Sequence, residues 1–372
     1  MAGFAQRVIR WQRRSGRSSL PWQGTRDPYR IWVSEIMLQQ TQVATAIPYY
    51  ERFMARFPDV QSLARASVDQ VLKLWSGLGY YSRGRNLHRA ARLITEGMSG
   101  RFPTQRAELE TLPGVGRSTA AAIAAFSVGA REAILDGNVK RVLCRHFAVE
   151  GSPTISAVHA RLWTLAESLL PAKAIEGYTQ GLMDLGATVC TRTKPACQRC
   201  PLQQSCEALR LGRPTDFPTR KARRPSPQRR TVMLLLQHGD KVLLQKRPSI
   251  GIWGGLWSFP EFEDVGAALA ACGRKDSQAA HGVLEPLRHS FSHYDLTIVP
   301  LVVKAPGLEC MVGKVFRWWS LGRAMVAPIP APVRTLLGRL PPSSSEDVRP
   351  GPAARAKRRA ARSGLPARGA AA

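Results

Sequence analysis

The chain has 372 residues, enough for two domains of ordinary size with connecting segments. Its 54 Lys and Arg residues against 26 Asp and Glu residues give a formal net charge of +28. This excess favours a polyanionic partner, because basic side chains that neutralise phosphates release counterions. No apolar run is long enough to span a bilayer, and the first residues lack the apolar core of a signal peptide. We therefore expect a cytoplasmic monomer that binds nucleic acid, with an anionic membrane surface as the alternative partner.

The first half of the chain is predicted to be helical. Over residues 4–209 the apolar residues recur at steps of three and four, most clearly in 71–75, 87–94, 119–126 and 139–147. One stretch near its start, IWVSEIMLQQTQV, places a single carboxylate, Glu35, in an apolar helical run. Apolar surroundings favour the protonated form of a carboxylic acid, so Glu35 is a candidate general acid. The alternative is a partly solvated helix residue.

A glycine-containing turn, LPGVG, precedes an Ala-rich helical pattern that ends at Gly129. Gly114 and Gly116 allow a tight turn, and backbone N–H groups at a helix N-terminus can bind a phosphate. An ordinary loop explains the same two glycines. Further along, Asp136 and Asn138 stand just before another helical pattern, in ILDGNVKRVL. Since Asp is a favoured N-cap residue, capping alone would account for Asp136.

Four of the seven cysteines lie close together after a predicted helix. They are Cys190, Cys197, Cys200 and Cys206. An odd total and an expected reducing compartment argue against a disulfide framework. Four thiolates suit either zinc or a [4Fe–4S] cluster. Zinc sites favour two C-x2-C pairs, whereas only one such pair is present here.

The second half of the chain has a different pattern. Residues 211–229 are rich in Pro and basic residues, which predicts a linker. Strand patterns then begin at residues 231, 241 and 294, with helical patterns near 264–272 and 331–340, in a smaller α+β domain over 230–340. Residues 341–372 have almost no large apolar side chains, so we expect a disordered basic tail.

In combination these motifs resemble the MutY family of adenine DNA glycosylases, in the endonuclease III superfamily. The matching stretches are LPWQ, WVSEIMLQQTQV, GLGYYSRGRNLH, LPGVGRSTA, ILDGNVKRVL and GLMDLGATVC, with FSH in the second half. The resemblance implies a mainly α-helical helix-hairpin-helix domain over 1–210, with one [4Fe–4S] cluster held by the four cysteines of loop 190–206. It also implies a Nudix-like domain that recognises 8-oxoguanine. That domain lacks the Arg-Glu-x2-Glu-Glu run of active Nudix enzymes, so we expect binding without hydrolysis.

The resemblance further implies removal of adenine opposite 8-oxoguanine or guanine in double-stranded DNA. Glu35 would protonate adenine N7 and later activate water, ionised Asp136 would stabilise the cationic sugar, and Asn138 would orient the site. Ser118 stands where strand-cutting relatives have the Lys that attacks the sugar carbon. A hydroxyl cannot form that Schiff base, so we predict base removal without efficient strand cleavage. Ser118 would also be the candidate to assist Asp136.

The DNA contacts are implied in the same way. Gln40 and Thr41 would bond to base edges exposed when adenine leaves, and Tyr80 would stack beside the 8-oxoguanine. A core tyrosine is the alternative for Tyr80. Ser292 would contact the oxidised guanine. The adenine pocket would be lined by Leu20, Trp22, Gln23 and Gln180.

Three other functions remain open on the sequence. One is a bifunctional glycosylase and lyase of the endonuclease III type, against which Ser118 and the second domain argue. Another is a non-catalytic iron–sulfur protein that senses redox state on DNA, which would need neither Glu35 nor Asp136. The last is a nucleotide hydrolase that uses the second half, which lacks the metal-binding carboxylates.

Overall fold

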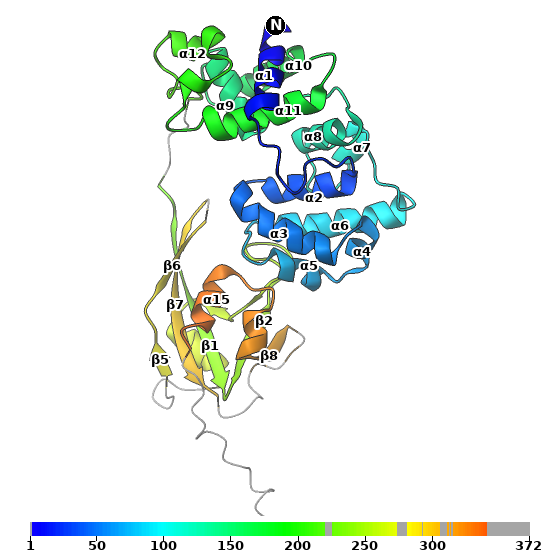
Figure 1. Cartoon of the computed structure of the whole chain (residues 1–372). Helices are drawn as coiled ribbons and strands as arrows, with labels where there is room; N and C mark the ends of the chain where they lie inside the picture. Colours follow the sequence, from blue (N-terminus) through cyan, green and yellow to red (C-terminus); the bar gives the residue numbers. More distant parts are fainter. Residues whose placement is uncertain are drawn as a thin grey trace, which may run out of the picture. The chain divides into compact units, whose positions relative to one another are not determined.

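The computed structural model describes residues 2–219, 225–273, 281–291, 293–305, 311, 313 and 315–340. The chain divides into two compact units, with the boundary between Pro225 and Ser226. The first unit is helical and the second is built around a β-sheet, as Figure 1 shows. In the part of the chain that is described, no helix has the length and apolar character needed to cross a membrane.

The first unit consists of helices joined by short loops. In chain order they are α1 (Ala2–Ser15), α2 (Pro28–Leu38), α3 (Val43–Arg56), α4 (Val60–Arg65), α5 (Val68–Trp75), α6 (Ser82–Gly97), α7 (Arg106–Glu110), α8 (Arg117–Val128), α9 (Gly137–His146), α10 (Ser156–Ser168), α11 (Ile175–Asp184) and α12 (Glu207–Arg210). A π-helical turn, η1 (Leu185–Val189), continues α11. The predicted helical stretches fall within α5, α6, α8 and α9, and the last of these ends at His146.

Local sequence explains where several of these helices begin and end. Asp27 caps α2 by accepting a hydrogen bond from Tyr29 N–H at 2.9 Å, and Pro28 occupies the first helical position. Capping boxes open α4 and α5. Gly129 ends α8 in the left-handed conformation, with φ of 70°.

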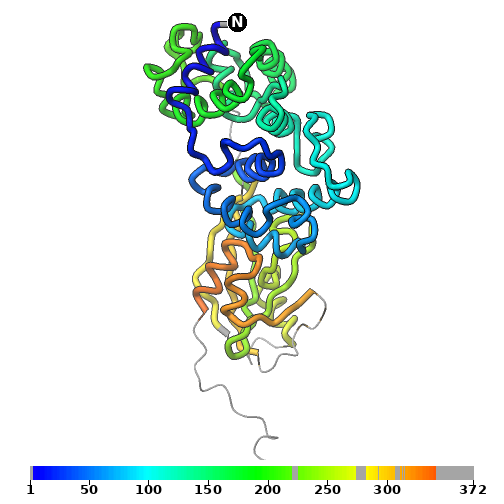
Figure 2. Tube along the Cα trace, turned by 45° about the vertical axis from the view of Figure 1, so that its right-hand side comes forward, coloured from blue at the N-terminus to red at the C-terminus, as the bar shows by residue number. Residues whose placement is uncertain are grey.

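The helices of the first unit form two groups, and the chain crosses between them. Helix α1 packs against α11, while α9 contacts α10, α12 and η1. The trace in Figure 2 accordingly shows the N-terminal helix alongside helices from residues 137–210. The other group contains α2 to α6. Helix α7 contacts α8, and α8 contacts both α2 and α11. The loop of residues 16–27 therefore runs from one group to the other.

The second unit is an α+β domain with a mixed sheet. Its strands are β1 (Gln228–His238), β2 (Lys241–Lys246), β3 (Trp257–Ser258), β4 (Glu261–Phe262), β5 (His281–Val283), β6 (Leu287–Ser290), β7 (Asp295–Lys304) and β8 (Phe316–Ser320). The main order is β3-β2-β1-β7-β5, with β4 paired to β1, β6 to β7 and β8 to β2. Strands β1 and β7 are parallel and the other pairs are antiparallel. The helices are α13 (Val265–Ala271), α14 (Leu321–Met325) and α15 (Ala331–Leu337).

The predicted linker over 211–229 is shorter in the structure. Phe217 is buried in the core of the first unit, and its carbonyl accepts a hydrogen bond from Arg145 Nε at 3.0 Å. At the other end, β1 already begins at Gln228. The Pro-rich and basic composition concealed this one apolar anchor. The predicted tail, 341–372, lies outside the described residues.

Candidate active site

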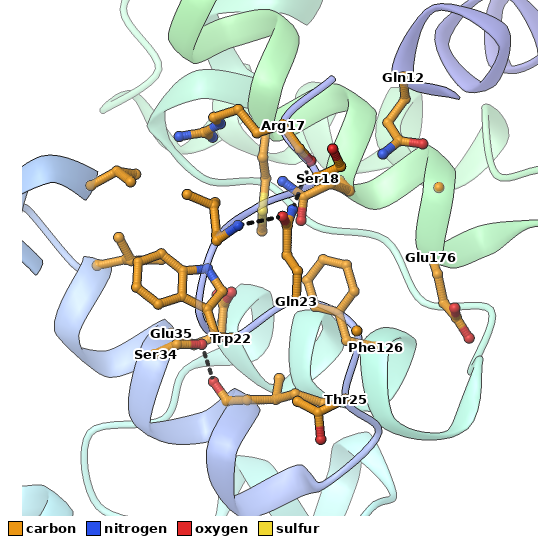
Figure 3. A pocket seen from close by; sticks show the side chains of 18 of the residues that line it. Gln12, Arg17, Ser18, Trp22, Gln23, Thr25, Ser34, Glu35, Phe126 and Glu176 are labelled. Atoms are coloured by element: carbon orange, nitrogen blue, oxygen red, sulfur yellow. Dashed lines mark hydrogen bonds between the residues drawn. The ribbon is translucent and has the colours of Figure 1, made fainter. Parts of the chain in front are cut away.

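A cavity of about 510 Å³ opens where the two helix groups of the first unit meet. Its volume lies in the ordinary range for small-molecule sites. Figure 3 shows side chains entering it from the 16–27 loop, from α2, from α8 and from α11. Residues far apart in the chain thus form its walls. The residues that line the cavity include Arg17, Leu20, Trp22, Gln23, Ile31, Glu35, Leu38, Phe126, Gln180 and Met183.

Glu35 supplies a carboxyl group to this cavity from α2. The side chain is half-buried, and Ile31 and Leu38, one turn away on the same helix, line the cavity beside it. Burial penalises the charged carboxylate, and the nearby Asp136 carboxylate penalises it further, so the pKa of Glu35 is raised to about 8. At neutral pH Glu35 therefore carries a proton that it can donate.

Asp136 is the N-cap of α9, as one interpretation of its sequence position predicted. Its Oδ1 accepts a hydrogen bond from Val139 N–H at 2.7 Å, and the Asn138 amide lies 3.5 Å from Oδ2. Burial raises the pKa of Asp136, while these donors and the Arg141 guanidinium oppose that rise. Among the described residues, no hydrogen-bond donor or cation lowers the pKa of Glu35 in this way. The two acids are therefore differentiated by hydrogen bonding, as an acid and a carboxylate with separate tasks require.

The residues beside Asp136 fix the position of its loop. Ser118 Oγ accepts a hydrogen bond from Leu135 N–H at 3.0 Å, so this hydroxyl supports the backbone next to Asp136. Arg141 Nη2 donates to Asn138 Oδ1 at 2.7 Å and to Gly186 O at 2.6 Å, and its Nε donates to Cys190 O at 2.7 Å. Arg141 thus links the residues after Asp136 to the start of the cysteine loop.

The predicted adenine-pocket residues line the cavity, but their amides are partly engaged. Gln23 accepts a hydrogen bond from Leu20 N–H at 3.0 Å and donates to Arg17 O at 2.9 Å, so both ends of its amide hold the 16–27 loop. Gln180 donates to Asp184 Oδ1 at 2.9 Å, which leaves its carbonyl oxygen and its second amide hydrogen available to a ligand. Asp184 is fully buried and also binds the backbone N–H and guanidinium of Arg17.

The predicted DNA-contacting residues lie outside the cavity lining. Gln40 and Thr41 follow the end of α2, and Tyr80 lies in the loop before α6, with 48% of its surface exposed. This exposure excludes the core-tyrosine alternative for Tyr80. Gly114 has φ of 82° in the turn between α7 and α8, and Gly116 is the N-cap of α8. Ser292 lies outside the described residues.

The four cysteines of the predicted cluster line one small cavity. The Arg145 guanidinium, itself buried, donates to Cys190 Sγ at 3.3 Å and to Thr191 O at 2.6 Å. Within the described ranges, no three His, Cys, Asp or Glu side chains are close enough together to hold a single metal ion. Four thiols that line one cavity could act as ligands of either a zinc ion or an iron–sulfur cluster.

Several cavity residues were missed in the sequence. Phe126 and Met183 contribute apolar walls from α8 and α11, and Arg17 with Asp184 anchors the 16–27 loop. Phe126 and Met183 look like ordinary core positions in helical patterns, so no local signal could have identified them. An acid within the apolar stretch GLMDLG was the one available sign for Asp184.

The chain resembles known DNA repair proteins in both halves. Residues 33–168 match the family described as HhH-GPD superfamily base excision DNA repair protein, and residues 231–339 match the NUDIX domain. The chain is 36% identical over 339 residues to the adenine DNA glycosylase of Buchnera aphidicola subsp. Acyrthosiphon pisum (strain APS), covering 90% of this chain and 96% of that one. It is 32% identical to the human adenine DNA glycosylase, covering 87% of this chain and 73% of the human one. The structure of a thermostable thymine-DNA glycosylase superposes with a TM-score of 0.52 at 30% identity, covering 56% of this chain and 95% of that chain.

A helix-hairpin-helix fold with a protonated acid in a cavity, and a second, hydrogen-bonded acid close enough to raise the pKa of the first, defines a DNA N-glycosylase that acts in base excision repair. Its partner is DNA, consistent with the strongly basic composition. The extended similarity to curated relatives narrows the class further. The chain belongs to the adenine DNA glycosylase family, and it removes adenine from DNA.

Proposed function

We propose that the substrate is adenine opposite 8-oxoguanine or guanine in double-stranded DNA, and that the enzyme removes the base without cutting the strand. The observation that carries this proposal is the pair formed by Glu35, which lines the cavity, and Asp136, whose charge helps to raise the pKa of Glu35. Among the described residues, hydrogen-bond donors reach the Asp136 carboxylate and not the Glu35 carboxyl. An adenine within a duplex must first rotate out of the stack into the cavity.

The pair would then divide the chemistry of bond cleavage. The bond from C1′ to N9 breaks, its electron pair leaves with adenine, and the Glu35 proton goes to N7. Asp136 stabilises the positive charge that develops on the sugar. The Glu35 carboxylate, now without its proton, accepts one from the water whose oxygen bonds to C1′, which returns Glu35 to its starting form. Asp136 keeps its orientation through Val139 N–H and the Asn138 amide.

Strand cleavage would require an amine that attacks the sugar carbon. The residue at the position of that amine is Ser118, whose hydroxyl accepts a hydrogen bond from Leu135 N–H. We therefore propose a monofunctional glycosylase, in contrast to the bifunctional alternative.

We also propose that Cys190, Cys197, Cys200 and Cys206 hold one [4Fe–4S] cluster. All four sulfurs would be used as ligands, which leaves no open coordination position, so the cluster would serve to order the loop. In support, the four thiols line one cavity and the buried Arg145 already donates to Cys190 Sγ. Iron and inorganic sulfide in equal amounts in the purified protein, and their loss in Cys200→Ser, would be the expected result.

The second unit is proposed to recognise 8-oxoguanine without hydrolysing nucleotides. Its sequence matches the NUDIX domain but lacks the acidic run that holds magnesium. The proposed contact through Ser292 falls on a residue that the structure does not describe. We propose a monomer as the working form on DNA.

A single-turnover assay tests these proposals together. Duplexes with A opposite 8-oxoguanine, A opposite G and A opposite T are incubated with the enzyme, and half of each reaction is treated with alkali. We expect strand breaks only after alkali, fastest for the 8-oxoguanine pair and absent for the T pair. Breaks without alkali would show a lyase, and equal rates for all three duplexes would contradict the proposed substrate.

A further inference from the structure

Arg83 is a buried cation that the chemistry above does not use. It lies on α6, and only 7% of its surface is exposed. Its Nη1 donates to the carbonyl oxygens of Ile36 at 3.0 Å and Met37 at 2.8 Å, and also to that of Gln39. Its Nη2 donates to Thr41 Oγ1 at 3.1 Å, Leu78 O at 3.3 Å and Gly79 O at 3.1 Å. One guanidinium therefore joins the segment after α2 to the loop before α6.

Each of the two joined segments contains a non-glycine residue in a left-handed conformation. These residues are Gln40, with φ of 57°, and Tyr80, with φ of 46°. Side chains with a Cβ rarely adopt such φ values, and those that do are held there by their surroundings. Both side chains are exposed.

The hydrogen bonds of Arg83 fall next to these two residues. On the first segment they reach Gln39 O and Thr41 Oγ1, which stand on either side of Gln40. On the second they reach Gly79 O, directly before Tyr80, and the Arg83 guanidinium carbon lies 5.6 Å from the centre of the Tyr80 ring. Arg83 thus binds the residues on both sides of Gln40 and, at the second position, the residue before Tyr80 together with the Tyr80 ring.

Helix capping accounts for only part of this arrangement. The carbonyls of Ile36 and Met37 lack partners within α2, because they belong to its last turn, and a guanidinium there is favourable. Capping does not require Thr41, Leu78 or Gly79. A planar group with several donors suits the double role in a way that a single amine does not.

We propose that Arg83 is a positioning residue that holds Gln40 and Tyr80 as one preformed wedge, so that both side chains enter the duplex together beside the base opposite the extruded adenine. This inference rests on the proposed function, and on the DNA contacts that the family resemblance implies for Gln40 and Tyr80. A wedge that is already ordered loses less conformational freedom when it inserts, which lowers the free energy needed to extrude the base.

Arg83→Lys is the variant that tests the proposal. It keeps the positive charge, but one amine cannot reach both segments in the geometry of a guanidinium. Arg89→Lys, on the exposed face of the same helix, is the matched control. Two signals are measured on a duplex that carries 2-aminopurine next to 8-oxoguanine: the fluorescence increase on unstacking and the single-turnover rate of adenine removal. Affinity for undamaged duplex is measured in parallel.

We expect Arg83→Lys to lose most of the fluorescence increase and to excise adenine roughly 10-fold more slowly, with unchanged affinity for undamaged duplex. Arg89→Lys should match the wild type. Combining Arg83→Lys with Tyr80→Ala should give a rate no lower than Tyr80→Ala alone, because both changes remove the same wedge. Thr41→Val removes one hydrogen-bond acceptor of Arg83 and leaves Arg83 itself in place. We expect it to lose a smaller part of the fluorescence increase than Arg83→Lys does.

Two results would overturn the proposal. One is a full fluorescence increase in Arg83→Lys together with slow excision, which would place its effect on the α2 end and Glu35. The other is an additive loss in the combined variant. If Arg83→Lys does not fold, a fluorescence increase in Thr41→Val that equals that of the wild type would overturn the proposal instead. Failure of the proposed function is distinguishable: a wild type that excises nothing can still show unstacking that depends on Tyr80 and Arg83.

Discussion

The raised pKa of Glu35 predicts how adenine removal depends on pH. Only the protonated acid can donate to N7, so the excision rate should be constant near neutral pH and fall as pH rises through about 8. By simple titration, about half of Glu35 is protonated at pH 8, about one-tenth at pH 9 and about one-hundredth at pH 10. An unshifted Glu, with a pKa of 4.5, would already have lost nearly all of its protons at neutral pH.

The assay is single-turnover excision at saturating enzyme, across a range from about pH 5 to about pH 10. Affinity for an uncleavable duplex is followed at each pH, so that loss of binding is not counted as loss of chemistry. Glu35→Gln should remove the alkaline limb and lower the rate by roughly 100-fold to 10,000-fold. Glu51→Gln, an exposed position on α3, is the matched control and should retain the wild-type profile.

An alkaline limb with its midpoint near 8 or higher would support the role of Glu35, since the phosphates of bound DNA can only raise its pKa further. A rate that already falls between pH 5 and pH 6, where an ordinary Glu loses its last protons, would refute the reasoning. So would the same alkaline limb in Glu35→Gln, because the titrating group would then be another residue.

Three further predictions follow from the same geometry. Glu35 has a pKa of about 4.5 in the unfolded chain and about 8 in the folded one, so its carboxyl destabilises the fold progressively as pH rises between those values. We therefore expect Glu35→Gln to be more stable than the wild type by about 3 kcal/mol at pH 7 but not at pH 4. The difference is measured as a shift in melting temperature. In Gly186→Ala the new Cβ would lie 2.5 Å from the Asn138 Cβ, so we expect roughly 10-fold slower excision, whereas Gly97→Ala, with nothing within 4 Å of its Cβ, should be unaffected. Asp184→Asn breaks the buried ion pair with Arg17 and should lower the free energy of unfolding by about 3 kcal/mol. Glu96→Gln, in an exposed ion pair, should lower it by less than about 1 kcal/mol. Equal melting temperatures for the two variants would contradict the anchoring role of Asp184.

The sequence predicts the helical first half well because its periodicity and capping residues are local signals. Glu35 could be identified by a mismatch between one acid and its apolar neighbours, and the structure agrees, since burial is the main cause of its raised pKa. The sequence position of Asp136 also predicts an N-cap, and Asp136 is the N-cap of α9 in the structure. A residue can serve as cap and catalyst together, because the cap uses one carboxylate oxygen and leaves the other.

The cavity itself could not be read from the sequence, since its walls come from segments that are distant in the chain. Phe126 and Met183 carry no mark that separates them from core residues. Gln23 lines the cavity, but no local signal indicated that the loop would use both ends of its amide. The buried anchor at Phe217 was likewise hidden by the Pro-rich composition around it. Each of these depends on contacts that only the folded chain brings about.

The position of α1 has a consequence for the order in which the enzyme forms during synthesis. Part of the cavity wall comes from residues 12–26, and the adjoining part comes from residues 176–183. The ribosome makes the first of these early, and α1 must wait for α11 before its apolar face is covered. Closing so long a loop is slow, and the waiting surface is prone to association. The cavity is therefore completed late, and a nascent chain that stops before α11 contains Glu35 but lacks the part of the cavity wall that α11 supplies.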